Sequence, residues 1–86
     1  MAKVTIYTTG MCGFCHAAKR LLSDKGVEFH EIDVTFDRAK RREMADKAGR
    51  TSVPQIWVGE THVGGCDELY ALERAGKLDP LLQTGA

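Results

Sequence analysis

Two cysteines separated by two residues, Cys12 and Cys15, are the side chains of this sequence best suited to do chemistry. The residues before them, Val4 to Thr8, have the β-branched and aromatic composition of a strand, and apolar residues recur at helical spacing from Cys15 onward. The pair therefore lies at the predicted start of a helix, where unpaired N–H groups and the helix dipole stabilise a thiolate. A free thiol titrates near ~8.5, whereas cysteines of a helix-start Cys-x-x-Cys pair titrate at roughly 3.5–7.

The two sulfurs are expected to have different roles. Cys12, with its side chain over the N–H groups of Phe14 and Cys15, is predicted to be the nucleophile. Cys15, inside the first turn, is predicted to be more buried and to act as the resolving thiol. An i, i+3 spacing leaves both sulfurs on one side of the turn, close enough to bond. Beside a βαβ pattern, such a pair indicates redox chemistry first.

Two other kinds of chemistry share these residues. Cys12 to His16 spells the Cys-x-x-Cys-His of c-type haem attachment, but the flanking βαβ pattern leaves no helices to wrap a haem and no export signal is recognisable. Cys12, Cys15, His62 and Cys66 are ligand types that zinc accepts, but the stretch between Cys15 and His62 far exceeds the usual loop of a zinc site. Both interpretations are weaker than the redox one, and no metal site is predicted from these spacings.

The periodicity after the cysteines predicts a βαβα arrangement. The first helix is expected to end at Lys25-Gly26, and residues 27–34 alternate as a second strand, parallel to the first through a right-handed crossover. Asp37 is suited to cap a second helix over residues 38–48, which Gly49 ends. The side chains expected to face inward from this helix are Ala39, Met44, Ala45 and Ala48.

The last third of the chain predicts a hairpin and a helix. Two short apolar runs flank Gly59-Glu60, a third helix opens at Cys66 and ends at Gly76, and residues 78–82 add a short helical turn. The order βαβαββα makes an α/β fold with one four-stranded mixed sheet and helices on both faces.

Length and composition limit the organisation and the partners. Eighty-six residues make one domain, residues 1–86, of which about 3–82 are expected to be ordered. Twelve basic residues balance twelve acidic ones, so there is no electrostatic reason to expect nucleic acid or a membrane as a partner. The chain is expected to be a monomer, and the absence of a signal-peptide pattern predicts a cytoplasmic location.

Two further loops have features of a ligand site. Pro54 belongs at the first position of a strand, and spacing alone favours a trans Val53-Pro54 bond; a cis bond would turn the backbone groups of Val53 outward to pair with an extended peptide. Residues 64–67 form a second helix start whose N–H groups favour a carboxylate. Asp67 either caps this helix or pairs with the amino group of a zwitterionic ligand. Phe14 is either an apolar wall beside Cys12 or a core aromatic.

Three motifs, in order along the chain, resemble those of the glutaredoxins, and of the bacterial glutaredoxin 3 type in particular. Cys12-Gly13-Phe14-Cys15 matches the dithiol motif, Thr51-Ser52-Val53-Pro54 is similar to the Thr-Val-Pro segment with its cis proline, and Gly64-Gly65-Cys66-Asp67 is similar to the Gly-Gly-x-Asp segment. The resemblance covers nearly the whole chain. It implies a thioredoxin fold and glutathione-dependent reduction of protein–glutathione mixed disulfides and protein disulfides, with glutathione as co-substrate.

The resemblance also implies residue roles. Cys12 would attack the substrate disulfide and Cys15 would resolve it, while Val53 would pair through its backbone with the cysteinyl part of glutathione. Cys66 and Asp67 would hold the γ-glutamyl end, and Arg41 would bind the glycine carboxylate. The full set that the resemblance assigns to glutathione is Cys12, Phe14, Arg41, Ser52, Val53, Pro54, Gly65, Cys66 and Asp67.

Two residues depart from the family pattern. Thr9 stands where the family commonly has a lysine, three residues before the nucleophile, and the missing cation would weaken glutathione binding. Gly13-Phe14 replaces the usual Pro-Tyr and is similar to the monothiol glutaredoxins, some of which hold an iron–sulfur cluster between two subunits. The alternative function is therefore a [2Fe-2S] carrier that uses Cys12 and glutathione in a bridged dimer.

Overall fold

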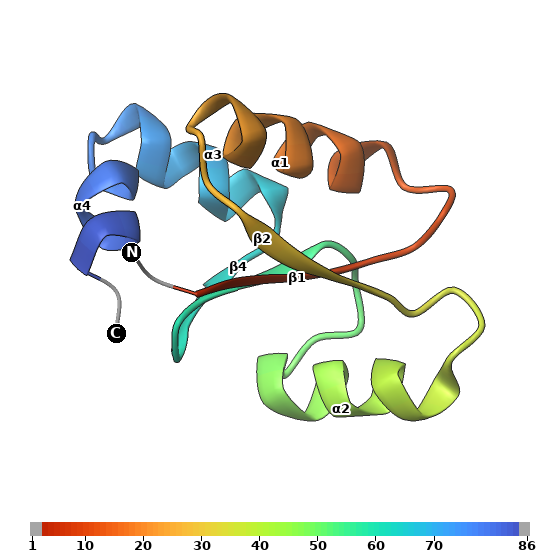
Figure 1. Ribbon diagram of the computed structural model, residues 1–86. Helices are drawn as coiled ribbons and strands as arrows, with labels where there is room; N and C mark the ends of the chain where they lie inside the picture. Colours follow the sequence, from red (N-terminus) through yellow and green to blue (C-terminus); the bar gives the residue numbers. More distant parts are fainter. Residues whose placement is uncertain (1–2, 85–86) are drawn as a thin grey trace.

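The computed structural model describes residues 3–84 as one four-stranded sheet with four helices. Figure 1 follows the chain through these elements. They are β1 (Val4–Thr8), α1 (Gly13–Asp24), β2 (Phe29–Asp33), α2 (Arg38–Ala48), β3 (Gln55–Val58), β4 (Thr61–Gly64), α3 (Cys66–Arg74) and α4 (Leu78–Thr84). Of the helices in this range, none is long and apolar enough to cross a membrane.

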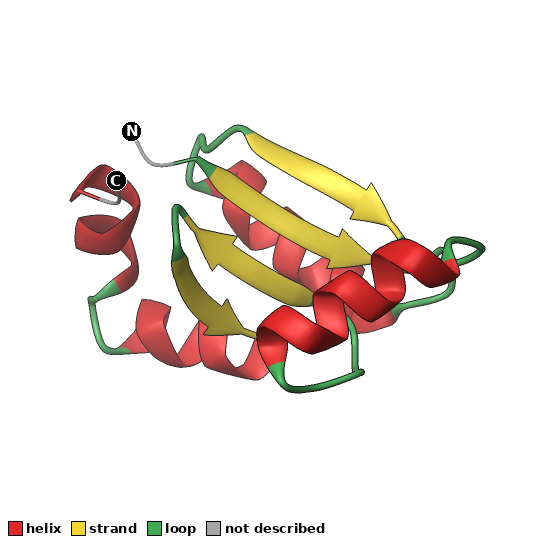
Figure 2. Cartoon of the chain, turned by 90° about the horizontal axis from the view of Figure 1, so that it is seen from below, coloured by secondary structure: helices red, strands yellow, loops and turns green. Residues whose placement is uncertain are grey.

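The sheet has the order β2-β1-β3-β4, with β1 and β2 parallel and the other neighbours antiparallel. Helices α1 and α3 cover one face and α2 covers the other, as both views show (Figures 1 and 2). The chain therefore adopts the thioredoxin-like fold predicted from the sequence, with the predicted element order. The short helical turn expected over residues 78–82 is α4, which extends to Thr84.

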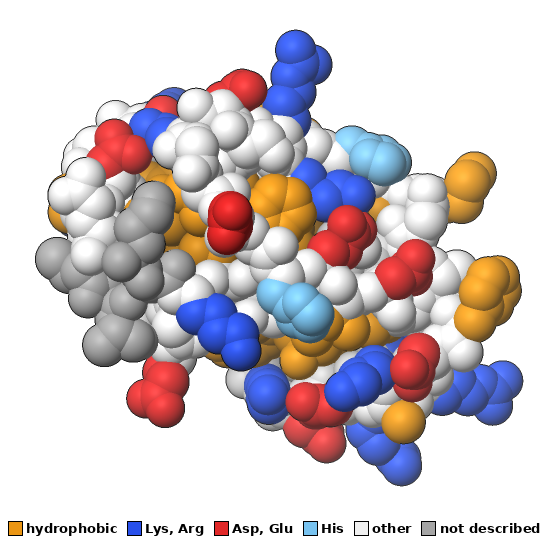
Figure 3. Space-filling model, viewed as in Figure 1, with side chains coloured by type: hydrophobic (Ala, Val, Ile, Leu, Met, Phe, Trp, Pro, Cys, Tyr) orange, Lys and Arg blue, Asp and Glu red, His pale blue; other side chains and the backbone are white. Residues whose placement is uncertain are grey.

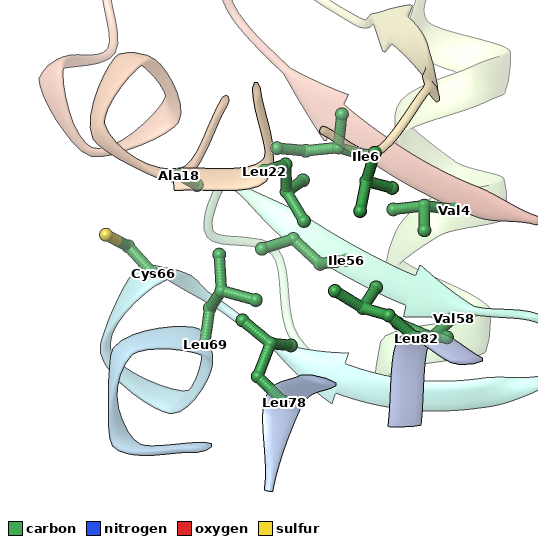
Figure 4. Packing of buried hydrophobic residues seen from close by; sticks show 11 residues of the cluster. Val4, Ile6, Ala18, Leu22, Ile56, Val58, Cys66, Leu69, Leu78 and Leu82 are labelled. Carbon is green, nitrogen blue, oxygen red and sulfur yellow. The ribbon is translucent and has the colours of Figure 1, made fainter. Parts of the chain in front are cut away.

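Successive side chains along the strands point to opposite faces of the sheet, so a hydrophobic core forms on each side of it. Val4 and Ile6 of β1 pack with residues of α1, α3 and α4, and Figure 4 shows this cluster between the helices and the sheet. Tyr7, one position on, points to the other face and packs with Met44 of α2. The two clusters fix the helices on opposite faces, because strand side chains alternate with a period of two.

Two details of the predicted elements differ in the structure. Residues 27–34 were expected to form the second strand, but β2 is limited to Phe29–Asp33 because it pairs in register with the five residues of β1. Ala39 was expected to face inward and is exposed instead, since it lies in the first turn of α2, beyond the edge of the core. Asp37 caps α2 through the N–H of Lys40, and Gly49 ends the helix with φ 70°, both as predicted.

The topology brings four loops to one end of the sheet. The parallel strands β1 and β2 both end there, the antiparallel strand β3 begins there, and β4 ends there. The cysteine pair follows β1, the Val53-Pro54 bond precedes β3, and Gly65 follows β4. The three motifs that lie far apart in the sequence therefore meet at this end.

Candidate active site

The sulfur of Cys12 lies at the start of α1. Cys12 is the N-cap residue, with extended φ and ψ of −119° and 106°, and its Sγ accepts a hydrogen bond from the N–H of Cys15 at 3.1 Å. Its thiol in turn donates to the carbonyl oxygen of Val53 at 3.7 Å. The sequence predicted two N–H donors, from Phe14 and Cys15, and the structure has only the second of these within residues 3–84. This hydrogen bond holds the Cys12 sulfur over the first turn of α1.

Cys15 lies behind Cys12 and is fully buried. Burial, and after it the hydrogen bond with the Cys12 thiol, raises the pKa of Cys15 to about 12. A backbone hydrogen bond from Thr9 works in the opposite direction, as does the charge of Lys19, and neither outweighs burial. Both cysteines are reduced in the structure. Cys15 thus stays protonated at neutral pH, whereas the half-buried Cys12 is open to a reactant.

The loop before β3 forms one wall of the site. The Val53-Pro54 peptide bond is cis, as the family resemblance implied and as spacing alone did not. Across residues 3–84 no acceptor takes the N–H of Val53. The fully buried Gln55 holds the loop, because its Nε2 donates to the carbonyl oxygen of Ser52 at 2.9 Å and its Oε1 pairs with Nε2 of His62 at 2.8 Å.

The start of α3 forms the facing wall. Gly65 is the N-cap residue, and its N–H donates to Oε1 of Glu68 at 2.7 Å. The same oxygen accepts from Nη2 of Arg50 at 2.8 Å, and this bond is the main reason why the pKa of Glu68 is lowered. Within the described range the N–H groups of Cys66 and Asp67 have no acceptor. The interpretation that Asp67 caps this helix is wrong, because the N-cap residue is Gly65, Asp67 lies inside the first turn, and no side-chain hydrogen bond caps the helix.

A pocket of about 200 Å³ lies between these walls. Phe14 forms one side of it and is 67% exposed, so the interpretation as a core aromatic is wrong. The lining residues are Phe14, Arg50, Ser52, Val53, Pro54, Gly65, Cys66, Asp67 and Glu68. Cys12 adjoins the pocket through its contact with Val53.

Of the nine residues assigned to glutathione by the resemblance, seven line this pocket, Cys12 adjoins it, and Arg41 does not line it. The seven are Phe14, Ser52, Val53, Pro54, Gly65, Cys66 and Asp67. Arg41 is exposed on α2, and its Nη2 donates to the carbonyl oxygen of Thr51 at 3.3 Å, one residue before Ser52. It therefore lies beside the pocket wall, and its role stays a prediction.

Sequence reasoning missed Arg50 and Glu68. Glu68 stands three residues after Gly65, the spacing at which an acidic side chain returns to the N-cap amide, and this signal was present in the sequence. Arg50 follows the helix-ending Gly49 and had no local signal, because its partner comes from another element.

Cys66, the third thiol, lies in the pocket wall. It is buried, and burial followed by the negative charge of Asp67 raises its pKa. Figure 4 shows its side chain at the edge of the cluster near Leu69. It is thus a small buried side chain that supports the pocket.

Comparisons with known proteins agree on one family. A family model described as Glutaredoxin matches residues 4–63. The chain is 62% identical over 84 residues to a glutaredoxin of Pseudomonas aeruginosa, covering 98% of this chain and 100% of the relative. It is 55% identical over 83 residues to glutaredoxin 3 of Escherichia coli strain K12, covering 96% of this chain and 100% of that protein.

Solved structures give the same result. The solution structure of glutaredoxin from Brucella melitensis has a TM-score of 0.89 and 53% identity, and the match covers 100% of this chain and 94% of that one. The crystal structure of a buckwheat glutaredoxin–glutathione complex has a TM-score of 0.88 and 27% identity, and the match covers 95% of this chain and 77% of that one. Since the family model spans more than half of the chain and both relatives match it over nearly its full length, the chain belongs to the glutaredoxin family.

Proposed function

We propose that the chain is a glutathione-dependent thiol–disulfide oxidoreductase that reduces protein–glutathione mixed disulfides and protein disulfides. The observation that carries this proposal is the contrast between the two sulfurs. Cys12 is accessible and accepts the N–H of Cys15 at 3.1 Å, whereas Cys15 is buried and protonated. Cys12 is then the nucleophile and Cys15 the resolving thiol.

The pocket suits the tripeptide glutathione, which has two carboxylates, one amino group and an extended backbone. The unpaired N–H of Val53 is available to the cysteinyl part, and the N–H groups of Cys66 and Asp67 are available to the γ-glutamyl carboxylate. The Asp67 side chain would pair with the amino group, and Arg41 would bind the glycine carboxylate from beside Thr51. The buckwheat relative was solved as a complex with glutathione, which supports glutathione as the ligand of this chain.

On a mixed disulfide the reaction needs Cys12 alone. The Cys12 thiolate attacks the glutathione sulfur, so that a Cys12–glutathione disulfide forms, the protein–glutathione bond breaks, and the protein leaves as a thiolate that takes up a proton. The thiolate of a second glutathione then attacks the glutathione sulfur on Cys12, which releases glutathione disulfide and restores the Cys12 thiolate.

On a protein disulfide both cysteines take part. Cys12 attacks one sulfur of the protein disulfide, so that a Cys12–protein disulfide forms and the other protein sulfur leaves as a thiolate that takes up a proton. Cys15 then attacks the Cys12 sulfur, which releases the second protein thiol and leaves a Cys12–Cys15 disulfide that two glutathiones reduce to two thiols, with glutathione disulfide as product. Cys15 must lose its proton before it attacks, and its raised pKa opposes this loss. We therefore expect the mixed-disulfide route to be the faster one. A cysteine pair that glutathione keeps reduced suits a reducing compartment, and the proposal includes a cytoplasmic location.

A glutathione-coupled assay on a small mixed disulfide, compared with a protein disulfide, tests this division of roles. Cys15→Ser should keep most of the activity on the mixed disulfide and lose the dithiol route, and Cys12→Ser should lose both. Loss of mixed-disulfide turnover in Cys15→Ser would contradict the assignment of Cys15 as the resolving thiol. Absence of turnover in the wild-type chain would overturn the proposal itself.

A second candidate function is a [2Fe-2S] carrier in which two chains and two glutathiones hold the cluster through Cys12. The Gly13-Phe14 turn favours it, because it is similar to the turn of the monothiol glutaredoxins and leaves the surface beside Cys12 open, with no atom within 4 Å of a Cβ added at Gly13. Across residues 3–84 no three His, Cys, Asp or Glu side chains lie together as a metal site, so one chain alone does not supply the ligands. Thiolates are the ligands that such clusters take.

Anaerobic reconstitution with iron, sulfide and glutathione tests the second candidate. Visible absorbance that accompanies a dimer on size-exclusion chromatography, and that is lost in Cys12→Ser, would support it. A colourless monomer under the same conditions would eliminate it.

A further inference from the structure

Two large apolar side chains are almost fully exposed at the end of the molecule that holds Cys12. Met11 and Phe36 are each 98% exposed, and neither lines the pocket beside Cys12. Met11 directly precedes Cys12 in the chain. Single exposed hydrophobic residues are ordinary, but two of them on neighbouring loops, one directly before the reacting cysteine, indicate a contact surface.

A hydrogen bond joins the two loops that carry these side chains. The N–H of Gly10, next to Met11, donates to Oγ1 of Thr35, next to Phe36, at 2.9 Å. Thr35 is itself held by Asp33, which accepts its N–H at 2.8 Å and its hydroxyl at 2.6 Å. The β1–α1 and β2–α2 loops thus lie at the same end of the sheet (Figure 1). Figure 3 shows hydrophobic side chains projecting from the surface there.

We propose that Met11 and Phe36 form a docking surface for the polypeptide part of the substrate, and that this surface selects substrates with large apolar side chains beside the reacting cysteine. The inference rests on the proposed function. It adds to the glutathione pocket a second contact area, outside that pocket, which discriminates between polypeptides.

The size of the possible occupants favours a polypeptide. Glutathione is a tripeptide, and the pocket that suits it is lined by neither Met11 nor Phe36. In a polypeptide joined to the site by a disulfide, each residue spans at most ~3.3–3.6 Å, so the residues on either side of its cysteine stay close to Cys12. They must therefore lie over the surface around Cys12 that glutathione leaves open, which includes Met11.

Docking of this kind acts on binding and not on sulfur exchange. The Cys12 thiolate still attacks the glutathione sulfur, and the peptide still leaves as a thiolate that takes up a proton. An apolar contact made equally in the bound substrate and in the transition state changes KM more than kcat.

Three mixed disulfides of glutathione provide the test: one with 2-mercaptoethanol, one with a short peptide that has Leu and Phe beside its cysteine, and one with the same peptide carrying Ser and Gln instead. The proteins compared are the wild type, the double variant Met11→Ser/Phe36→Ser and the control Met11→Leu/Phe36→Leu. We expect kcat/KM of the wild type to be about tenfold higher for the apolar peptide than for the polar one, because partial burial of two large side chains is worth about one order of magnitude in binding.

The serine variant should lose this preference through a higher KM, the leucine variant should keep most of it, and all three proteins should turn over the 2-mercaptoethanol disulfide equally. Equal preference in the wild type and the serine variant would overturn the inference, as would a matching loss on the 2-mercaptoethanol disulfide. Failure of the wild type on every substrate would instead refute the proposed function.

Discussion

Within one turn of helix, two identical side chains acquire different chemistry. Cys12 ends its strand-like loop at the N-cap of α1, where its sulfur receives an N–H and meets solvent. Cys15, three residues on, turns into the core and has no exposed surface. The spacing that keeps the sulfurs close enough to bond also makes one of them reactive and the other protected.

This difference predicts how alkylation depends on pH. In Cys12→Ser/Cys66→Ser, where Cys15 is the remaining thiol, iodoacetamide labelling of the folded protein should be negligible from pH 6 to pH 9. The reason is that burial blocks access and is also the largest cause of the raised pKa of Cys15, and burial remains when Cys12 is replaced. After unfolding in urea, the same thiol should react with the pH dependence of a free cysteine, near ~8.5. Mass spectrometry of the labelled protein measures both rates.

The matched control is Cys15→Ser/Cys66→Ser, which leaves Cys12. Its thiol should label readily in the folded state, because it is accessible and accepts the N–H of residue 15. A Cys15 that labels in the folded protein as fast as in urea would show that it is neither buried nor held protonated.

At the scale of the elements, the site depends on how each loop is held. The Ser52 to Pro54 segment has no regular structure of its own, and the buried Gln55 at the start of β3 anchors it through Ser52. The start of α3 is anchored by Glu68 and Arg50. Each wall of the pocket is therefore fixed by a side chain that does not itself have to touch the reacting sulfur.

Replacing Gln55 by Leu tests whether the bond to Ser52 holds the loop in the position that glutathione binding needs. The substitution keeps the side-chain size but leaves the carbonyl of Ser52 without its donor, so we expect a stability loss of about 1–3 kcal/mol and a several-fold higher KM for glutathione. Urea unfolding and steady-state kinetics measure the two effects.

His62→Ala is the matched control for this prediction. It removes the partner of the other end of the Gln55 amide and the stacking on Trp57, while the bond to Ser52 remains. It should lower stability without raising KM. A KM that stays at the wild-type value in Gln55→Leu would show that Ser52 does not need this anchor.

The helices and strands were more predictable from the sequence than the contacts between them. Strand alternation and helix caps are local patterns, so β1, α2 and the hairpin were predicted at nearly their observed bounds. The ends of β2 were not, because strand length depends on the partner with which it pairs. Arg50 was missed for the same kind of reason, because its role depends on Glu68, a residue of α3 that the fold brings to the loop after α2.

On the scale of the whole molecule, the same core cluster supports α3, which begins at the pocket (the functional end), and α4, which does not contact the pocket (the structural end). One cluster on the α1 side includes Leu69 of α3 and Leu78 of α4, both fully buried. Helix α3 begins in the pocket with Cys66 and Asp67, whereas α4 contributes no residue to it. The same large-to-small substitution in the core beside α3 and beside α4 should therefore have different effects on glutathione binding.

Leu69→Ala and Leu78→Ala make this comparison, because each removes the same atoms from a fully buried position. Each should lower the free energy of unfolding by about 2–5 kcal/mol and so reduce Tm by at least about 8 °C in a domain of this size. Only Leu69→Ala should also raise KM for glutathione at 25 °C, because it loosens the helix whose first N–H groups face the pocket. Thermal unfolding and kinetics on the folded fraction give both quantities. If Leu78→Ala raised KM as much as Leu69→Ala, the pocket would depend on the core as a whole, and the functional and structural ends would not be separable.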